Sequence, residues 1–89
     1  MNYDLMTFNR QPLRFTTIEK KSYVSLSDIL NISNLTRPNN LTTINSSIIT
    51  EYGYNPIELI SVMDAIELVK SANKVNPKLL EILETRVTH

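Results

Sequence analysis

Two pairs of carboxylates have a spacing that could support acid–base chemistry. Asp64 and Glu67 are three positions apart, as are Glu81 and Glu84, so each pair would lie on one side of a helix. Two carboxylates held close together can act as a general acid and a general base. The solvated side of an ordinary helix produces the same spacing. We therefore interpret both pairs as surface charge and expect no enzyme activity.

The residues that other catalytic and ligand-binding sites require are scarce. The 89-residue chain has no cysteine, one histidine at its last position, His89, and one glycine, Gly53. A nucleophile needs a neighbouring base, structural zinc needs Cys or His ligands, and phosphate-binding loops need several glycines. We expect no catalytic residue, no cofactor and no metal site. Gly53 is expected to supply a backbone angle that other residues avoid.

The charge balance argues against nucleic acid as the main partner. Nine basic residues face nine acidic ones, whereas proteins that contact phosphates usually have a basic excess. Residues 1–50 carry five basic and three acidic residues, and residues 51–89 carry four basic and six acidic. Arg14, Lys20 and Lys21 lie among aromatic residues and would form a basic β-hairpin. The alternative hypothesis is therefore a small DNA-binding transcriptional regulator, although our main interpretation expects no direct DNA contact.

The length and hydropathy of the chain predict one small domain spanning residues 1–89. No apolar run is long enough to cross a membrane, and the first residues lack the pattern of a signal peptide. We expect a cytoplasmic protein of the α+β class. A domain of this size without disulfides often gains stability by self-association, so we also expect a homo-oligomer.

The N-terminal half predicts a β-hairpin followed by a short helix. Residues 13–18 and the Tyr23–Val24 pair favour strands, and the polar residues 19–22 favour a turn between them. Residues 1–7 are either a lead-in or a further short strand. Ser25 and Asp28 have the spacing of a capping box, which predicts the start of a helix. Pro38 disfavours helical angles at Arg37, so we expect this helix to end near Asn34.

The C-terminal half predicts a further strand and then a helical hairpin. Residues 33–47 read as a loop with a brief strand at 41–44, and residues 47–52 favour a strand. The Asn55–Pro56 pair is typical of a helix start and predicts a long helix over 57–72. Asn76–Pro77 predicts the start of a second helix over 78–87.

The predicted long helix has a wider apolar surface than a small core requires. Its apolar residues cover much more than the ~100° stripe of a one-sided surface helix, which indicates a neighbour on a second side. Tyr52 and Tyr54 flank Gly53, and tyrosine is frequent at interface hot spots. Met63 has the adaptable side chain that binding surfaces favour. The predicted partner-binding residues are Tyr52, Tyr54, Leu59, Met63, Ile66, Leu79, Ile82 and Leu83.

One stretch of the chain resembles a known family. Phe8 opens it, Leu13–Arg14 and Tyr23–Val24 follow, and Asp28–Leu30 begins the helix. This pattern resembles the N-terminal segment of phage antirepressors and the related Bro-N domains, over about a quarter of the chain. The resemblance implies a small protein in the host bacterial cell that binds a helix-turn-helix phage repressor. Removal of that repressor from operator DNA would promote lytic induction.

Overall fold

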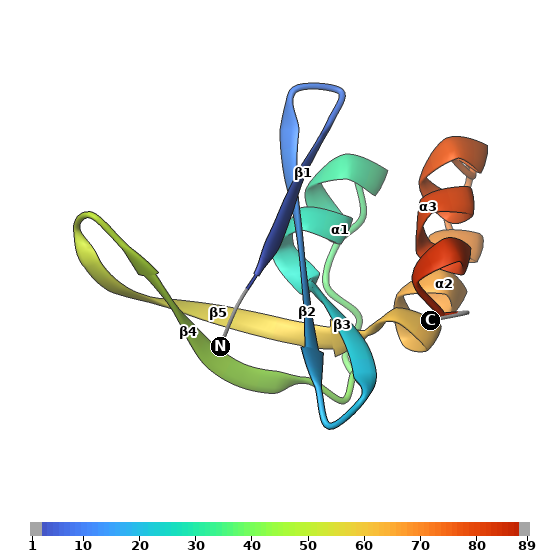
Figure 1. Cartoon of the computed structure of the whole chain (residues 1–89). Helices are drawn as coiled ribbons and strands as arrows, with labels where there is room; N and C mark the ends of the chain where they lie inside the picture. The colour runs from blue at the N-terminus through green and yellow to red at the C-terminus, as the bar shows by residue number, and fades with distance from the viewer. Residues whose placement is uncertain (1–2, 88–89) are drawn as a thin grey trace.

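The computed structural model of the chain describes residues 3–87, with Thr50 described by its backbone alone. Five strands form one antiparallel sheet in the order β1-β2-β3-β5-β4, and three helices accompany it (Figure 1). The predicted α+β class is confirmed. In chain order the elements are β1 (Asp4–Phe8), β2 (Gln11–Ile18), β3 (Lys21–Ser25), α1 (Leu26–Ser33), β4 (Ile44–Thr50), β5 (Gly53–Ser61), α2 (Val62–Lys70) and α3 (Pro77–Val87).

Two tight turns connect the first three strands. Asn9 and Arg10 join β1 to β2 with φ of 48° and 67°, and Glu19 and Lys20 join β2 to β3 with φ of 50° and 68°. Two-residue loops with positive φ at both positions match the right-handed twist of the strands that they connect. The predicted hairpin is confirmed, and the N-terminal residues add the short strand β1. Neither turn contains glycine, although glycine and asparagine favour these angles.

The helix α1 begins directly after β3, but its predicted capping box does not form. Ser25 makes no side-chain hydrogen bond at the N-cap. The Asp28 carboxylate instead accepts hydrogen bonds from the backbone and side chain of Arg14. The helix ends at Asn34, which has a left-handed φ of 54°, so the predicted end is confirmed.

The predicted helix over 57–72 is wrong at residues 57–61. Residues 53–61 form the strand β5, and only Val62–Lys70 is helical. Pro56 pairs with Ser47 of β4, whereas β3 reaches β5 only from Leu59 onward. Near Pro56, β5 therefore has a partner strand on one side only. Proline has no N–H to donate, and it is tolerated in a strand where its nitrogen faces the side without a partner. The strand β4 also begins earlier and ends earlier than predicted.

Side-chain caps define the last two helices. The Ser61 hydroxyl accepts a hydrogen bond from the N–H of Asp64 at 3.1 Å and caps α2. The Asn76 side chain accepts hydrogen bonds from the N–H groups of Lys78 and Leu79 and caps α3. The two helices pack against each other, which confirms the predicted C-terminal helical hairpin.

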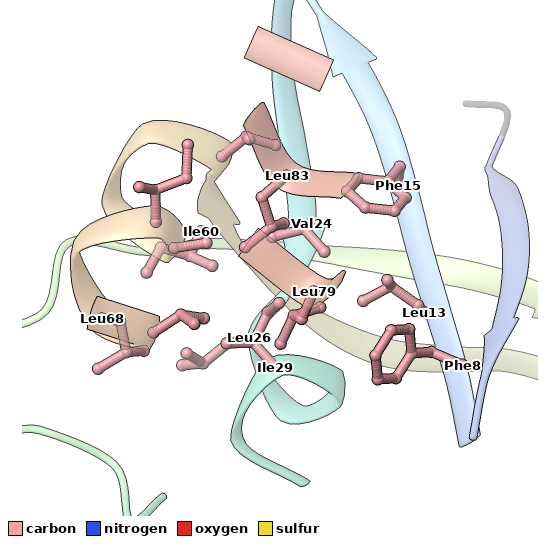
Figure 2. Packing of buried hydrophobic residues seen from close by; sticks show 14 residues of the cluster. Phe8, Leu13, Phe15, Val24, Leu26, Ile29, Ile60, Leu68, Leu79 and Leu83 are labelled. Carbon is pink, nitrogen blue, oxygen red and sulfur yellow. The ribbon is translucent and has the colours of Figure 1, made fainter. Parts of the chain in front are cut away.

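The main core lies between one face of the sheet and the three helices (Figure 2). Val24 of β3 is directly opposite Ile60 of β5, and both are fully buried. The helices supply the other side of this core. Its buried members are Phe8, Leu13, Phe15, Val24, Leu26, Ile29, Ile60, Val62, Ala65, Ile66, Leu68, Val69, Leu79 and Leu83.

The sheet is strongly curved, so a second face is also partly covered. Although β1 and β4 are its two edges, the Tyr3 hydroxyl lies 3.4 Å from the Ser46 hydroxyl. Figure 1 shows β4 and β5 running across the direction of β1 and β2. Side chains alternate between faces along a strand, so Ile57 and Leu59 point away from the Ile60 side, and both are buried. The inner end of β5 is therefore buried on both faces.

Candidate protein-interaction surface

The outer part of the β4–β5 hairpin extends away from the helices. We call residues 47–56 the distal arm. Over these residues β5 is paired with β4 alone, because β3 has already ended. Figure 1 shows the hairpin projecting from the side of the molecule opposite α2 and α3. Side chains on the distal arm therefore receive little cover from the rest of the chain.

Three large side chains on the distal arm are exposed. Ile49 of β4 and Tyr54 of β5 are directly opposite each other and are 72% and 76% exposed. Tyr52, in the turn, is 89% exposed. Gly53 follows it with φ of +107°, in a region that other residues avoid, as predicted. Residues directly opposite on neighbouring strands contact each other, so Ile49 and Tyr54 form one apolar and aromatic patch.

The distal arm has no basic residue. The sequence contains no Lys or Arg between Arg37 and Lys70, and Glu51 lies in the turn of the hairpin. At the inner end, Glu58 forms an ion pair with Arg37 and accepts a 2.6 Å hydrogen bond from Thr43. The bonds from Arg37 and then Thr43 lower the pKa of Glu58 to about 2. The distal arm therefore carries the acidic residue Glu51 and offers no cation for contact with a phosphate.

Several of the predicted partner-binding residues are buried within the fold. Leu59 belongs to β5 and is fully buried, as are Leu79 and Leu83 of α3. Ile66 of α2 is also buried. Ile66, Leu79 and Leu83 belong to the main core, and Leu59 is buried on the other face of β5. None of the four side chains is exposed to a partner in this structure.

The remaining predicted residues are available to different degrees. Tyr52 and Tyr54 are exposed together on the distal arm, and Met63 is 58% exposed at the start of α2. Ile82 of α3 is half-buried against the core. Ile49 was missed. An alternating pattern that pairs Ile49 with Tyr54 around a turn at Glu51–Tyr52 would have revealed it.

The predicted basic hairpin is not assembled as one DNA-binding surface. The Arg14 guanidinium is bound to the Asp28 carboxylate at 2.8 and 3.0 Å, and this interaction raises the pKa of Arg14 above its usual range. Lys20 and Lys21 are exposed at the β2–β3 turn, and the Lys21 ammonium lies 5.8 Å from the Tyr23 ring. Two of the three cations therefore remain accessible, and the third is committed to the fold.

Two other kinds of site are absent from the part of the chain that the structure describes. Within residues 3–87, no three acidic or histidine side chains are grouped as metal ligands would be, and His89 lies outside this range. Over the same residues, no helix is long and apolar enough to cross a membrane. A cleft of about 400 Å³ lies between the ends of the helices, with Val69, Ala72 and Val75 in its lining.

Comparisons with protein families, with curated proteins and with solved structures found no match to this chain. The residues that carry the resemblance to phage antirepressors nevertheless have a clear structural place. Arg14 and Asp28 form an ion pair between β2 and α1, in which the Asp28 side chain is buried. Phe8 and Val24 belong to the main core. These residues belong to the body of the fold and lie outside the distal arm.

Proposed function

We propose that this chain is a protein-binding module of the phage antirepressor class that captures a phage repressor through its distal arm. The observation that carries the proposal is the exposed group of Ile49, Tyr52 and Tyr54 on a hairpin that projects from the body. Aromatic side chains bury a large area with few rotatable bonds, and they are enriched among the residues that dominate binding energy.

The charge of the region supports a repressor as the partner. A helix-turn-helix repressor contacts phosphates through basic residues, so its DNA-binding side is positively charged. The distal arm contains one acidic residue, Glu51, and no basic one. Opposite charges favour encounter between the two proteins and add specificity. Ile49 and Tyr54 would supply the apolar centre of the contact.

The mechanism is a shift of populations. The module binds repressor that has left its operator, and the fraction of repressor able to hold DNA falls accordingly. No covalent step is involved, so neither an enzyme activity nor a cofactor is part of the proposal. The site of action is the cytoplasm of the host bacterial cell, where a phage repressor operates.

A gel-shift assay tests this function. The probe is operator DNA bound by the helix-turn-helix repressor encoded in the same prophage, titrated with the purified chain. We expect release of the DNA, and we expect the variant Tyr52→Ala/Tyr54→Ala to need at least tenfold more protein, the equivalent of about 1.4 kcal/mol. Leu5→Ala is the matched control, since Leu5 is 67% exposed on β1, outside the arm.

Two results would contradict the proposal. The first is an unchanged repressor–DNA band at every concentration of the folded chain. The second is binding of the chain itself to operator DNA, with loss of that binding in Lys20→Ala/Lys21→Ala. The second result would favour the alternative regulator that contacts DNA through the β2–β3 turn.

A further inference from the structure

We propose that two copies of the chain associate through their distal arms, with the outer edges of the two β4 strands paired antiparallel and Ile49 opposite Ile49 of the second copy. This contact uses the strand edge and leaves the exposed aromatic face of the arm accessible. It goes beyond capture of a repressor and does not depend on it.

The outer edge of β4 is available for pairing. Within residues 3–87, β4 is paired only with β5, so its other side presents unpaired N–H and C=O groups. Tyr3 approaches the inner part of β4 through its hydroxyl, which lies 3.4 Å from the Ser46 hydroxyl. The part of this edge that belongs to the distal arm begins at Ser47 and runs to the turn.

The two edges of the sheet differ in how they are guarded against pairing. Edge strands are usually protected by charged residues or proline. The β1 edge carries Asp4, whose carboxylate pairs with Arg86 at 3.0 Å. By contrast, Ile44–Thr50 contains no charged residue and no proline. Two copies of β4 can thus approach each other without placing like charges opposite one another.

The side chains select the register of this pairing. If Ile49 is opposite its own copy, Ser47 lies opposite Glu51 of the second chain. Ile49 and Tyr54 are already opposite each other within one hairpin. The pairing therefore creates a continuous row across four strands, in the order Tyr54, Ile49, Ile49, Tyr54, and such aromatic and branched neighbours stabilise a sheet.

The competing symmetric register is less favourable. With Ser47 opposite Ser47 of the second copy, each Ile49 would face Asn45, and the row of apolar side chains would be interrupted. Apolar matching therefore favours the register centred on Ile49. The paired segment is short, so we expect an association that depends on concentration.

Single cysteines test the register directly, because the chain contains none. Directly opposed residues of antiparallel strands have Cβ atoms about 4.5–5.5 Å apart, close enough for a disulfide after a small adjustment. Under mild oxidation we expect Ile49→Cys to form a covalent dimer at least tenfold faster than Ser47→Cys. Met63→Cys, on the exposed surface of α2, measures random collision.

Sedimentation of the unmodified chain gives the second measurement. At about 1 mM, where even a Kd near 1 mM produces dimer, we expect association that Ile49→Asp abolishes. Because Ile49 is 72% exposed, this variant should unfold at nearly the same temperature as the parent. A monomer at that concentration overturns the inference, as does cross-linking of Ser47→Cys or Met63→Cys as fast as Ile49→Cys. No repressor is present, so this failure is distinct from a failure of the gel shift.

Discussion

At the level of single residues, the ion pair between Arg14 and Asp28 connects the sheet to the first helix. The register places the Arg14 N–H on the side of β2 that faces β3, but β3 has turned into α1 at that point. The Asp28 carboxylate accepts this N–H at 3.0 Å and also binds the guanidinium. Its side chain is 1% exposed, so the charge requires these partners.

We expect Arg14→Met to destabilise the fold by about 3 kcal/mol. The substitution leaves a buried carboxylate with only one of its donors, and removal of one member of a buried ion pair is strongly destabilising. Urea denaturation of the variant measures the loss. Arg10→Met makes the same chemical change at an exposed turn residue and should cost little. If the two substitutions lowered the free energy of unfolding equally, the ion pair between Arg14 and Asp28 would make no specific contribution to stability.

Glu58 gives the chain a local dependence on pH. Its folded pKa of about 2 lies below the ordinary value of 4.5, so its bonds to Arg37 and Thr43 stabilise the fold above pH 4.5. This contribution decreases as the pH falls from 4.5 to 2. Glu58→Gln should lack it, so the stability difference between parent and variant should shrink over that range.

NMR shifts of Thr43 during an acid titration would locate this change. We expect them to move with the protonation of Glu58 in the parent and to stay constant in Glu58→Gln. Because the pair is partly exposed, added salt should reduce the difference. A difference between parent and variant that does not change from pH 4.5 to pH 2 would rule out the bonds as its source.

At the level of elements, β5 shows how one apolar pattern can arise from two different structures. The inner end of β5 is buried on both faces, which makes the sequence from Ile57 to Ile60 almost continuously apolar. The one-sided apolar pattern of α2 follows without a break. Together they resemble one helix with a very wide apolar surface, and Asn55–Pro56 adds the appearance of a helix start.

Elements with strong local signals were predictable, and those decided by distant partners were not. The turn at Glu19–Lys20 and the helix after Asn76–Pro77 depend on neighbours in sequence. By contrast, whether Pro56 starts a helix or lies on a free strand side depends on where β3 ends. The same holds for the candidate site. Tyr52 and Tyr54 are predictable as exposed residues because they flank Gly53 in sequence, whereas Ile49 becomes apparent only from its pairing with Tyr54 on the neighbouring strand.

Gly53 should control the shape of the distal arm. Its φ of +107° is disfavoured for any residue with a side chain. No atom lies within 4 Å of an added Cβ, so the cost of a substitution comes from the backbone angle and not from a clash. We expect Gly53→Ala to cost about 1 kcal/mol, with faster amide hydrogen exchange in β4 and unchanged exchange in α3. Ser47→Ala, also on the arm, is the control. Unaltered exchange in β4 would mean that the turn tolerates the residue.

At the level of the whole molecule, α3 joins the last part of the chain to the first strands. Leu79 and Leu83 are fully buried in the core. The Arg86 guanidinium lies 4.3 Å from the Phe15 ring centroid, and its ion pair with Asp4 reaches β1. In a small domain the loss of one such helix removes a large share of the buried area.

We therefore expect Leu83→Ala to cost about 2–5 kcal/mol, a large part of the 5–15 kcal/mol typical of a folded domain. Thermal unfolding followed by circular dichroism should show a much lower midpoint. Val87→Ala, at a more exposed position of the same helix, should have a small effect. A midpoint that Leu83→Ala leaves unchanged would indicate that α3 is not part of the cooperative unit.

The position of Asp28 also fixes how many residues the chain can hold between strand and helix. Each residue added to a helix advances it by 1.5 Å and rotates it by about 100°. One residue inserted between Val24 and Asp28 would therefore carry the carboxylate away from the Arg14 N–H. The length of this segment is therefore fixed, and variants should reject insertions here but tolerate them between the exposed residues Asn39 and Asn40.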